Sequence, residues 1–285
     1  MRELKGKRVL ITGAGSGLGK ALALKFGREG WQVACTDRQP ETAQQTLREI
    51  EKAGGKGLAE ALDVTSEEQF NAVAAWVKQA WSGIDVLVNN AGVATAGTVE
   101  DSPLEQWQWL FNINLFGCVR GARSVIATMK SQGGGHIVNI ASFAGIANPP
   151  ALASYNAAKA AVISLSETLR FELFADHIGV TVACPSFFAT NLIDSSRKAA
   201  AGTTSDAAAM EVAPQMMTIT DHLMKTATVT ADDVAADIYN AVQKNRFLTL
   251  THSDAKQRYH IKRLAPELFF RIAQKFTADF LKKQR

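Results

Sequence analysis

The chain has 285 residues, of which 47% are hydrophobic and 20% charged, and this composition excludes a disordered or fibrous protein. The formal net charge is +4, but the basic excess lies in the segment from Lys256 to Arg285, which holds nine basic and two acidic side chains. The rest of the chain holds 22 basic and 25 acidic side chains, so the sequence gives no indication of nucleic acid binding.

Neither a membrane span nor a secretory signal is recognisable in the sequence. No stretch approaches the ~18 consecutive apolar residues of a transmembrane helix, and the apolar run after Arg8 is too short for a signal peptide. The three cysteines, Cys35, Cys118 and Cys184, form no disulfide framework or metal-binding pattern and are expected to be core thiols in a reducing compartment. We therefore expect a cytoplasmic protein without a metal site.

Short apolar runs alternate with longer helical patterns from the N-terminus as far as Thr190. The expected strands are Arg8–Thr12, Gln32–Asp37, Lys56–Leu62, Val86–Asn89, His136–Ile140 and Val180–Cys184. The expected helices between them are Gly17–Arg28, Glu41–Ala53, Glu67–Trp81, Leu104–Met129 and Ser154–Ala175. This alternation indicates βαβ units and an α/β fold, built as a doubly wound parallel sheet with helices on both faces.

The pattern changes after Pro185. Residues 186–228 contain four methionines and no clear strand, and they are expected either to fill the core with short helices or to cover an apolar substrate. A helix over Thr230–Lys244 and a closing strand over Phe247–Leu250 follow. The sequence therefore predicts seven strands in a single domain, residues 1–285, with a core of about residues 5–250.

Glycines follow the first expected strand and open the first expected helix, in the run TGAGSGLG over residues 12–19. A pyrophosphate needs close approach to the backbone, which a Cβ would block, and it favours a helix N-terminus, where unpaired N–H groups and the helix dipole attract anions. The position of this run inside a βαβ unit predicts a dinucleotide-binding turn. The expected contacts are Gly13, Ser16, Gly17, Leu18 and Gly19.

An acidic residue, Asp37, follows the glycine run at the end of the second expected strand. A carboxylate there would accept hydrogen bonds from both ribose hydroxyls of NAD and would repel the 2′-phosphate of NADP. The neighbouring Arg38 leaves the alternative open, because a guanidinium beside the ribose would bind that phosphate. We predict NAD as the preferred cofactor.

Tyr155 and Lys159 lie four residues apart on an expected helix and so share one face. A free phenol has a pKa of about 10, and a nearby ammonium would lower that pKa by favouring the phenolate. Ser142 precedes this pair and comes just after an expected strand, where its hydroxyl could bind a carbonyl oxygen or an alkoxide. This order predicts an acid/base site.

Over about residues 5–250 the chain resembles the short-chain dehydrogenase/reductase family, in its single-domain branch with a Rossmann-like fold. The resemblance rests on the glycine turn and on several motifs in the same order: Asp63-Val64, Asn89-Asn90-Ala91-Gly92, Asn114, Ser142, Tyr155, Lys159 and Pro185 through Thr190. It implies a dehydrogenase or carbonyl reductase that transfers a hydride between nicotinamide C4 and a carbinol or carbonyl carbon.

The resemblance also implies a role for each matched residue. Tyr155 is the expected general acid/base, Lys159 lowers its pKa and holds the nicotinamide ribose, and Ser142 orients the substrate oxygen. Asn114 matches the position that holds a water in the proton relay, and Asp63 resembles an adenine contact. Further cofactor contacts are expected from Val64, Asn90, Ala91, Gly92, Pro185, Phe188 and Thr190.

The family usually has glycine after the proline, whereas here Pro185 is followed by Ser186, which is expected to alter the turn beside the nicotinamide. The expected substrate contacts, Ser142, Phe143, Phe187 and Leu192, indicate an apolar alcohol or ketone. Two alternatives are an NADP-dependent carbonyl reductase for a lipid-like substrate and a non-catalytic, dinucleotide-binding regulatory protein. The second is less consistent with a complete Ser–Tyr–Lys set.

A basic extension, residues 256–285, ends the chain. Its segment Lys262–Arg285 is expected to form an amphipathic helix with apolar residues at helical spacing: Leu264, Leu268, Ile272, Phe276 and Phe280. Docking on the protein's own core or on a neighbouring subunit is favoured over a membrane-surface contact or a flap over the substrate entrance. Family resemblance implies a homodimer or homotetramer, with helices 104–129 and 154–175 at the interface.

Overall fold

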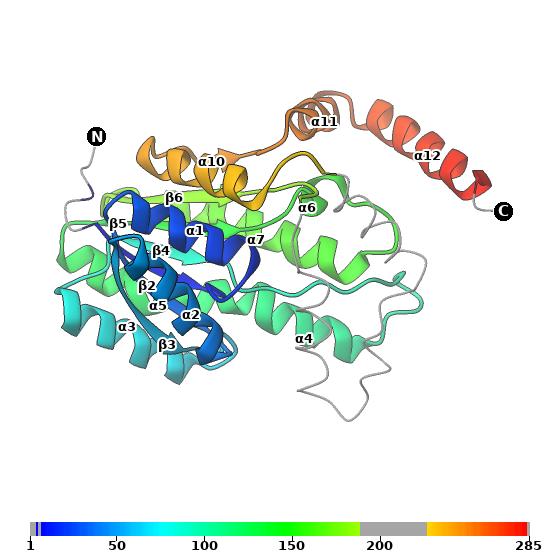
Figure 1. The fold of residues 1–285 in the computed structure, drawn as a ribbon. Helices are drawn as coiled ribbons and strands as arrows, with labels where there is room; N and C mark the ends of the chain where they lie inside the picture. The colour runs from blue at the N-terminus through cyan, green and yellow to red at the C-terminus, as the bar shows by residue number, and fades with distance from the viewer. Residues whose placement is uncertain (1–3, 5–6, 189–226, 284–285) are drawn as a thin grey trace.

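The computed structural model describes residue 4, residues 7–188 and residues 227–283, with residues 276–283 described by their backbone alone. Its centre is a parallel sheet of seven strands in the order β3-β2-β1-β4-β5-β6-β7 (Figure 1). The strands are β1 Arg8–Thr12, β2 Gln32–Asp37, β3 Lys56–Ala61, β4 Val86–Asn89, β5 Gly135–Ile140, β6 Ile178–Ala183 and β7 Leu248–Thr249. The predicted doubly wound, Rossmann-like sheet is confirmed.

Helices cover both faces of the sheet. They are α1 Gly17–Arg28, α2 Pro40–Lys52, α3 Glu67–Trp81, α4 Leu104–Asn114, α5 Phe116–Ser131, α6 Ala144–Ala147, α7 Ala153–Glu172, α10 Ala231–Gln243, α11 Ser253–Leu264 and α12 Pro266–Lys283. Apart from two helices, the expected bounds differ from these by at most three residues. The short α6 is an addition that the sequence analysis did not predict.

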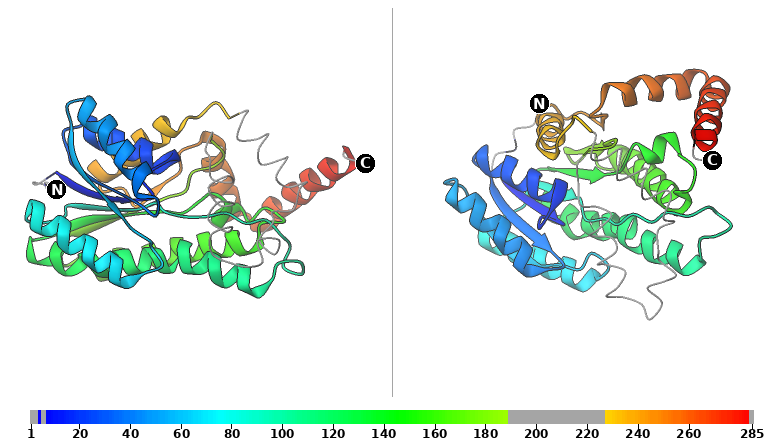
Figure 2. Two further views of the ribbon diagram at one scale, coloured as in Figure 1. Left: turned by 60° about the horizontal axis from the view of Figure 1, so that its bottom comes forward. Right: turned by 45° about the vertical axis from the view of Figure 1, so that its right-hand side comes forward.

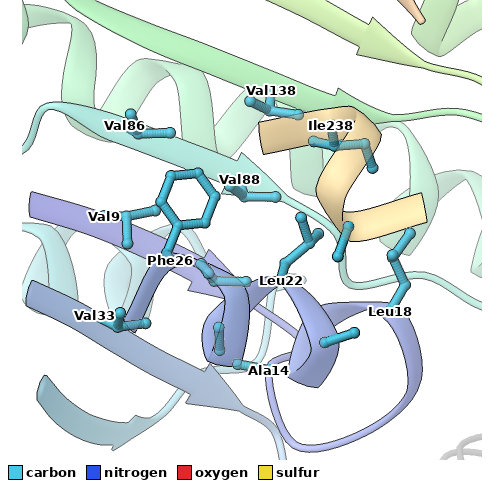
Figure 3. Close-up of a cluster of buried hydrophobic side chains, with 14 of the residues drawn as sticks. Val9, Ala14, Leu18, Leu22, Phe26, Val33, Val86, Val88, Val138 and Ile238 are labelled. Atoms are coloured by element: carbon cyan, nitrogen blue, oxygen red, sulfur yellow. The ribbon is translucent and has the colours of Figure 1, made fainter. Parts of the chain in front are cut away.

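Alternate strand residues enter two separate cores because successive side chains point to opposite faces. Val9 packs with α1, α2 and α10 on one face, as Figure 3 shows for Phe26 and Ile238. Leu10 packs on the other face with side chains of α3, α5 and α7, among them Phe70. Burial on both faces explains why the strands are continuously apolar.

Two expected helices are each divided in the structure. The helix expected over residues 104–129 consists of α4 and α5, which are separated at Leu115. The amphipathic helix expected to begin at Lys262 was wrongly placed, because α11 extends through Leu264 and α12 begins at Pro266. Ala265 has φ −143° and ψ 69°, since the proline ring disfavours the α conformation in the residue before it.

The C-terminal helices differ in their relation to the body. Helix α11 lies against α6, and α12, which follows α11, extends away from the sheet (Figure 2). Among the described side chains of α12, only Phe269 is buried. None of the helices within the described ranges is long and apolar enough to cross a membrane.

Candidate active site

The glycine turn leaves β1 and enters α1 at the carboxyl edge of the sheet. Gly13 has φ +64° and Gly17 has φ +52°, which L side chains rarely adopt. A Cβ on Gly19 would stand 2.0 Å from the Gly13 carbonyl oxygen and 2.4 Å from Asn90 Nδ2. The turn therefore depends on glycine both for its backbone conformation and for the close packing of α1.

The N-terminus of α1 is open to an anion. Ser16 is the N-cap residue, and its exposed side chain makes no capping hydrogen bond. The first turn, which includes Gly17 and Leu18, has no acidic side chain. Unpaired N–H groups and the positive end of the helix dipole make this position suitable for a phosphate group.

Asp37 lies beside this turn, at the end of β2. Its Oδ2 accepts a hydrogen bond from the Gly15 backbone N–H (3.0 Å), and its Oδ1 accepts one from the Gln39 backbone N–H (3.0 Å). These two bonds fix the carboxylate at the end of β2. The neighbouring Arg38 is exposed.

The segment after β4 connects the glycine turn to the rest of the site. Asn90 Nδ2 donates to the carbonyl oxygens of Thr12 (2.9 Å) and Gly13 (3.2 Å). The backbone N–H groups of Asn90 and Ala91 both donate to Thr12 Oγ1 at 3.0 Å. At the next residue, a Cβ on Gly92 would lie 3.1 Å from Asn114 Oδ1 and 3.5 Å from Lys159 Nζ.

Two of the expected polar residues are engaged with neighbouring segments of the chain. Asn114 is buried, and its side-chain amide donates to the Val93 carbonyl oxygen and accepts from the Val93 N–H, each at 2.8 Å. Asp63 Oδ1 accepts from the backbone N–H (2.9 Å) and hydroxyl (2.7 Å) of Thr65. The adjacent Val64 is buried.

Ser142, just after the C-terminal end of β5, lies close to Tyr155 and Lys159 in the N-terminal part of α7. The hydroxyl groups of Ser142 and Tyr155 share a hydrogen bond, and Lys159 Nζ lies 5.7 Å from the Tyr155 ring centroid. Lys159 Nζ also donates to the Ile140 carbonyl oxygen at 2.8 Å. Ser142 Oγ additionally accepts from the Ala144 N–H at 3.1 Å. The predicted hydroxyl, phenol and ammonium are thus in mutual reach.

Burial dominates the ionisation of these groups. It raises the pKa of Tyr155 to about 12, while the hydrogen bond with Ser142 lowers that pKa. Burial also lowers the pKa of Lys159 below its usual value. Two nearby free thiols, Cys118 and Cys184, have their pKa values raised by burial to about 11 and about 12, so they are neutral packing groups at physiological pH.

The aromatic residues expected near the substrate have different surroundings. Phe143 is buried in a core cluster with Val162 and Leu250. Phe188 is buried in the cluster beneath α1, whereas Phe187 is 38% exposed. The expected contacts Thr190 and Leu192, and most of the segment 186–228 with its four methionines, lie outside the described residues.

The turn after β6 lies directly beside Ser142. The Phe143 N–H donates to the Pro185 carbonyl oxygen at 2.8 Å, and Cys184 Sγ accepts a hydrogen bond from the Ser142 backbone. Ser186, where the family usually has glycine, is absent from the described residues with positive φ, so its Cβ adds no strain of that kind.

Sequence analysis did not identify His252, whose ring contacts this same turn. His252 Nδ1 accepts from the Ser186 N–H (3.3 Å), and Nε2 lies 2.9 Å from the Phe187 carbonyl oxygen. Both partners are backbone groups in a distant part of the sequence, so no local motif could have indicated this contact.

Comparison with known proteins agrees with this geometry. A family model described as short chain dehydrogenase matches residues 7–201. The probable oxidoreductase EphD of Mycobacterium tuberculosis (strain ATCC 25618 / H37Rv) is 35% identical over 260 residues, which are 91% of this chain and 43% of that protein. This chain therefore spans less than half the length of EphD.

Two further similarities cover more of the other protein. The 3-oxoacyl-(acyl-carrier-protein) reductase FabG of Thermotoga maritima is 37% identical over 192 residues, 67% of this chain and 78% of that protein. A short chain dehydrogenase/reductase from Burkholderia phymatum, solved in complex with NAD, has a TM-score of 0.83 at 31% identity and covers 94% of this chain and 96% of that one.

Proposed function

Because this chain belongs to the short chain dehydrogenase family, we propose that it transfers a hydride between NAD(H) and the carbinol or carbonyl carbon of a small alcohol or ketone. The observation that carries the proposal is the contact of Ser142, Tyr155 and Lys159 at the same sheet edge as the glycine turn. Such an arrangement supports this function, because it would give a proton donor and an oxygen-binding hydroxyl beside a dinucleotide.

The turn after β1 fits a dinucleotide, because glycine at positions 13 and 19 lets the turn pack closely against Asn90 and the start of α1, where a Cβ would collide with the protein's own atoms. The uncapped N-terminus of α1 would hold the pyrophosphate, and the Asp37 carboxylate would hold the adenosine ribose. The bound nicotinamide supplies or accepts the hydride. We propose further contacts with the cofactor from Asp63, Val64, Ala91, Gly92, Pro185, Phe188 and Thr190.

In the reducing direction, the carbonyl carbon gains a hydride and its oxygen gains the Tyr155 proton. Since the pKa of Tyr155 is raised to about 12, the phenol carries that proton at neutral pH. The Ser142 hydroxyl hydrogen-bonds to the substrate oxygen and to the phenol. The ammonium of Lys159 stabilises the phenolate left behind, which regains a proton from solvent; in alcohol oxidation each transfer is reversed. Asn114 is proposed to anchor this relay.

An apolar substrate is supported by Phe187, which is partly exposed beside the active-site turn. A relative named 3beta-hydroxysteroid dehydrogenase 1, from Eggerthella lenta, is 37% identical over 185 residues, and it is named for an apolar alcohol. An NADP-dependent reductase for a lipid-like ketone is the second candidate, favoured by Arg38 beside the adenosine ribose position. The complete Ser–Tyr–Lys set argues against a purely regulatory dinucleotide-binding protein.

We also propose a homodimer or homotetramer, formed through α5 and α7. Phe116 on α5 is 50% exposed, and Phe171 on α7 and Phe174 just beyond its end are 83% and 81% exposed. Burying such side chains in a symmetric interface would gain roughly 1.5–3 kcal/mol each. The three free thiols support a cytoplasmic location, where cysteines stay reduced.

The test is the Tyr155→Phe variant, assayed by nicotinamide absorbance with NADH and a panel of ketones (cyclohexanone, an acyl ketone and a steroid ketone). Loss of the phenolic proton should lower kcat by about 10²–10⁴-fold. The dissociation constant of NADH, measured by protein fluorescence, should stay within about twofold because the glycine turn is unchanged. Turnover near the wild-type value in this variant would refute the assigned role of Tyr155.

A further inference from the structure

The turn that follows β6 is fixed from two sides. Towards the active site, the Pro185 carbonyl oxygen accepts from the Phe143 N–H (2.8 Å), directly after Ser142. Towards the C-terminus, the Cys184 N–H donates to the Thr249 carbonyl oxygen (2.9 Å). The turn therefore lies between the segment that carries the active-site hydroxyl and the segment that leads into α11.

His252 contacts Ser186 and Phe187, the two middle residues of the 185–188 turn. Its Nδ1 accepts from the Ser186 N–H at 3.3 Å and its Nε2 lies 2.9 Å from the Phe187 carbonyl oxygen. Since a carbonyl oxygen can only accept, Nε2 must carry the ring proton, and Nδ1 is then free to accept. The Thr251 hydroxyl, 2.8 Å from Nδ1, is a donor in the same arrangement and shares the single Nδ1 lone pair with the Ser186 N–H. The Nε2-protonated tautomer is compatible with all three contacts.

These bonds set the orientation of two consecutive phenylalanines. With the backbone held at Ser186 and Phe187, the Phe187 side chain faces outward and is 38% exposed, and Phe188 turns into the core beneath α1. Phe188 shares that core with Ala14 and Leu18, which belong to the glycine turn and the start of α1. The histidine thus links the substrate side of the site to the cofactor side.

The same C-terminal segment contacts the other flank of Ser142. Lys262 Nζ, on α11, donates to the carbonyl oxygen of Ile146 in α6, the short helix that begins two residues after Ser142. With its side-chain amide turned so that nitrogen donates to the Ala144 carbonyl oxygen, Asn148 also accepts from Lys262 Nζ at 2.8 Å. Residues 252–262 therefore hold both backbone segments beside the active-site hydroxyl.

We propose that His252 is a positioning residue of the active site, which holds the 185–188 turn in place through its Nε2-protonated ring and so shapes the substrate wall that Phe187 forms. The inference rests on the proposed oxidoreductase function for its catalytic consequence. Its structural part, the ring tautomer and the two backbone contacts, is independent of any activity.

Three substitutions separate the two contacts. His252→Asn keeps a polar atom near the position of Nδ1, His252→Gln keeps one near the position of Nε2, and His252→Leu keeps neither. Losing both bonds should raise the KM of the best ketone of the panel about tenfold, a value matching two hydrogen bonds of modest net strength. We expect kcat and the dissociation constant of NADH to stay within about twofold, and Asn and Gln each to restore part of the KM.

His260→Leu is the matched control, because His260 is an exposed histidine of α11 in edge contact with Tyr259. Nitrogen NMR of the full chain with labelled histidine gives the second measurement, with the His252 signal assigned by its loss in His252→Gln. The expected result is a proton on Nε2 and none on Nδ1. An Nδ1-protonated ring, or a KM of His252→Leu equal to that of His260→Leu, would overturn the proposal. A different result would separate the two proposals: if the wild-type protein turns over none of the ketones but the His252 ring is protonated on Nε2, the proposed substrate class is wrong. The contact of His252 with the 185–188 turn would then still be supported.

Discussion

The acid/base pair is governed at the residue scale by burial. The phenol of Tyr155 is buried and its pKa is raised to about 12, and the hydrogen bond with Ser142 is the interaction that lowers this pKa. Ionisation of the phenol is needed to accept a proton from an alcohol. In the oxidising direction, activity should therefore rise with pH across the alkaline range, and in the reducing direction it should be nearly independent of pH around neutrality.

Ser142→Ala tests this account. Removal of the hydrogen bond that favours the phenolate should raise the pKa of Tyr155 further. The increase of kcat for alcohol oxidation with pH should therefore occur at higher pH than in the wild-type protein. The rate should also fall, by about 10²-fold, because an oxygen-binding hydroxyl is lost. The measurement is kcat for oxidation against pH in both proteins. An increase of kcat that occurs at lower pH in Ser142→Ala than in the wild-type protein would contradict the role given to Ser142.

Cofactor choice is also a property of one residue. Asp37 is fixed by hydrogen bonds from Gly15 and Gln39, so its carboxylate cannot turn away from a 2′-phosphate without breaking them. Asp37→Ala should raise the NADPH-to-NADH ratio of kcat/KM by about tenfold or more, the equivalent of about 1.4 kcal/mol. Arg38→Ala in the same background should reverse the gain. A wild-type preference for NADPH would refute the proposed role of Asp37.

At the scale of an element, the start of α1 depends on one missing side chain. Gly→Ala within a helix usually stabilises by about 1 kcal/mol. At Gly19 a Cβ would meet backbone atoms of the turn, the Gly13 carbonyl oxygen at 2.0 Å. Gly19→Ala should therefore lower the free energy of unfolding by about 1–3 kcal/mol and weaken NADH binding.

Gly27→Ala in the same helix is the control, since the nearest atoms to its Cβ would be those of the Ile50 side chain, at 3.0 Å, far from the turn. Urea unfolding and an NADH fluorescence titration measure both effects. Unchanged NADH affinity in Gly19→Ala would show that the turn tolerates a side chain and does not form the cradle.

At the scale of the whole molecule, the sequence predicted the features that depend on local patterns. The strands and the glycine turn follow from periodicity and spacing, and Tyr155 and Lys159 follow from their shared helix face. Pro266 also predicts the break at Ala265, which the continuous helix expected from Lys262 did not include. The contacts of His252 and Lys262 were not predictable, because each joins a side chain to a backbone group in a distant part of the sequence.

The two C-terminal helices should respond differently to truncation. Helix α11 is tied to α6 through Lys262, whereas α12 exposes Leu268 (52%), Phe270 (43%) and Ile272 (53%). Removing residues 266–285 should leave the free energy of unfolding and NADH binding nearly unchanged. Removal of residues 251–285 should raise the ketone KM about tenfold, since the His252 contacts are lost with α11.

The shorter deletion also tests what covers the apolar side chains of α12. If a second subunit covers them in addition to the interface proposed at α5 and α7, the lost apolar contact weakens association, so light scattering should show the oligomer dissociating at a higher protein concentration than in the full chain. Binding of the full chain and of the deletion variant to vesicles containing anionic lipid tests the alternative, a membrane-surface contact of α12. The basic residues Arg271 and Lys275 would favour such a surface. Unchanged mass combined with loss of vesicle binding on deletion would show that α12 contacts a membrane surface and not another copy of the chain.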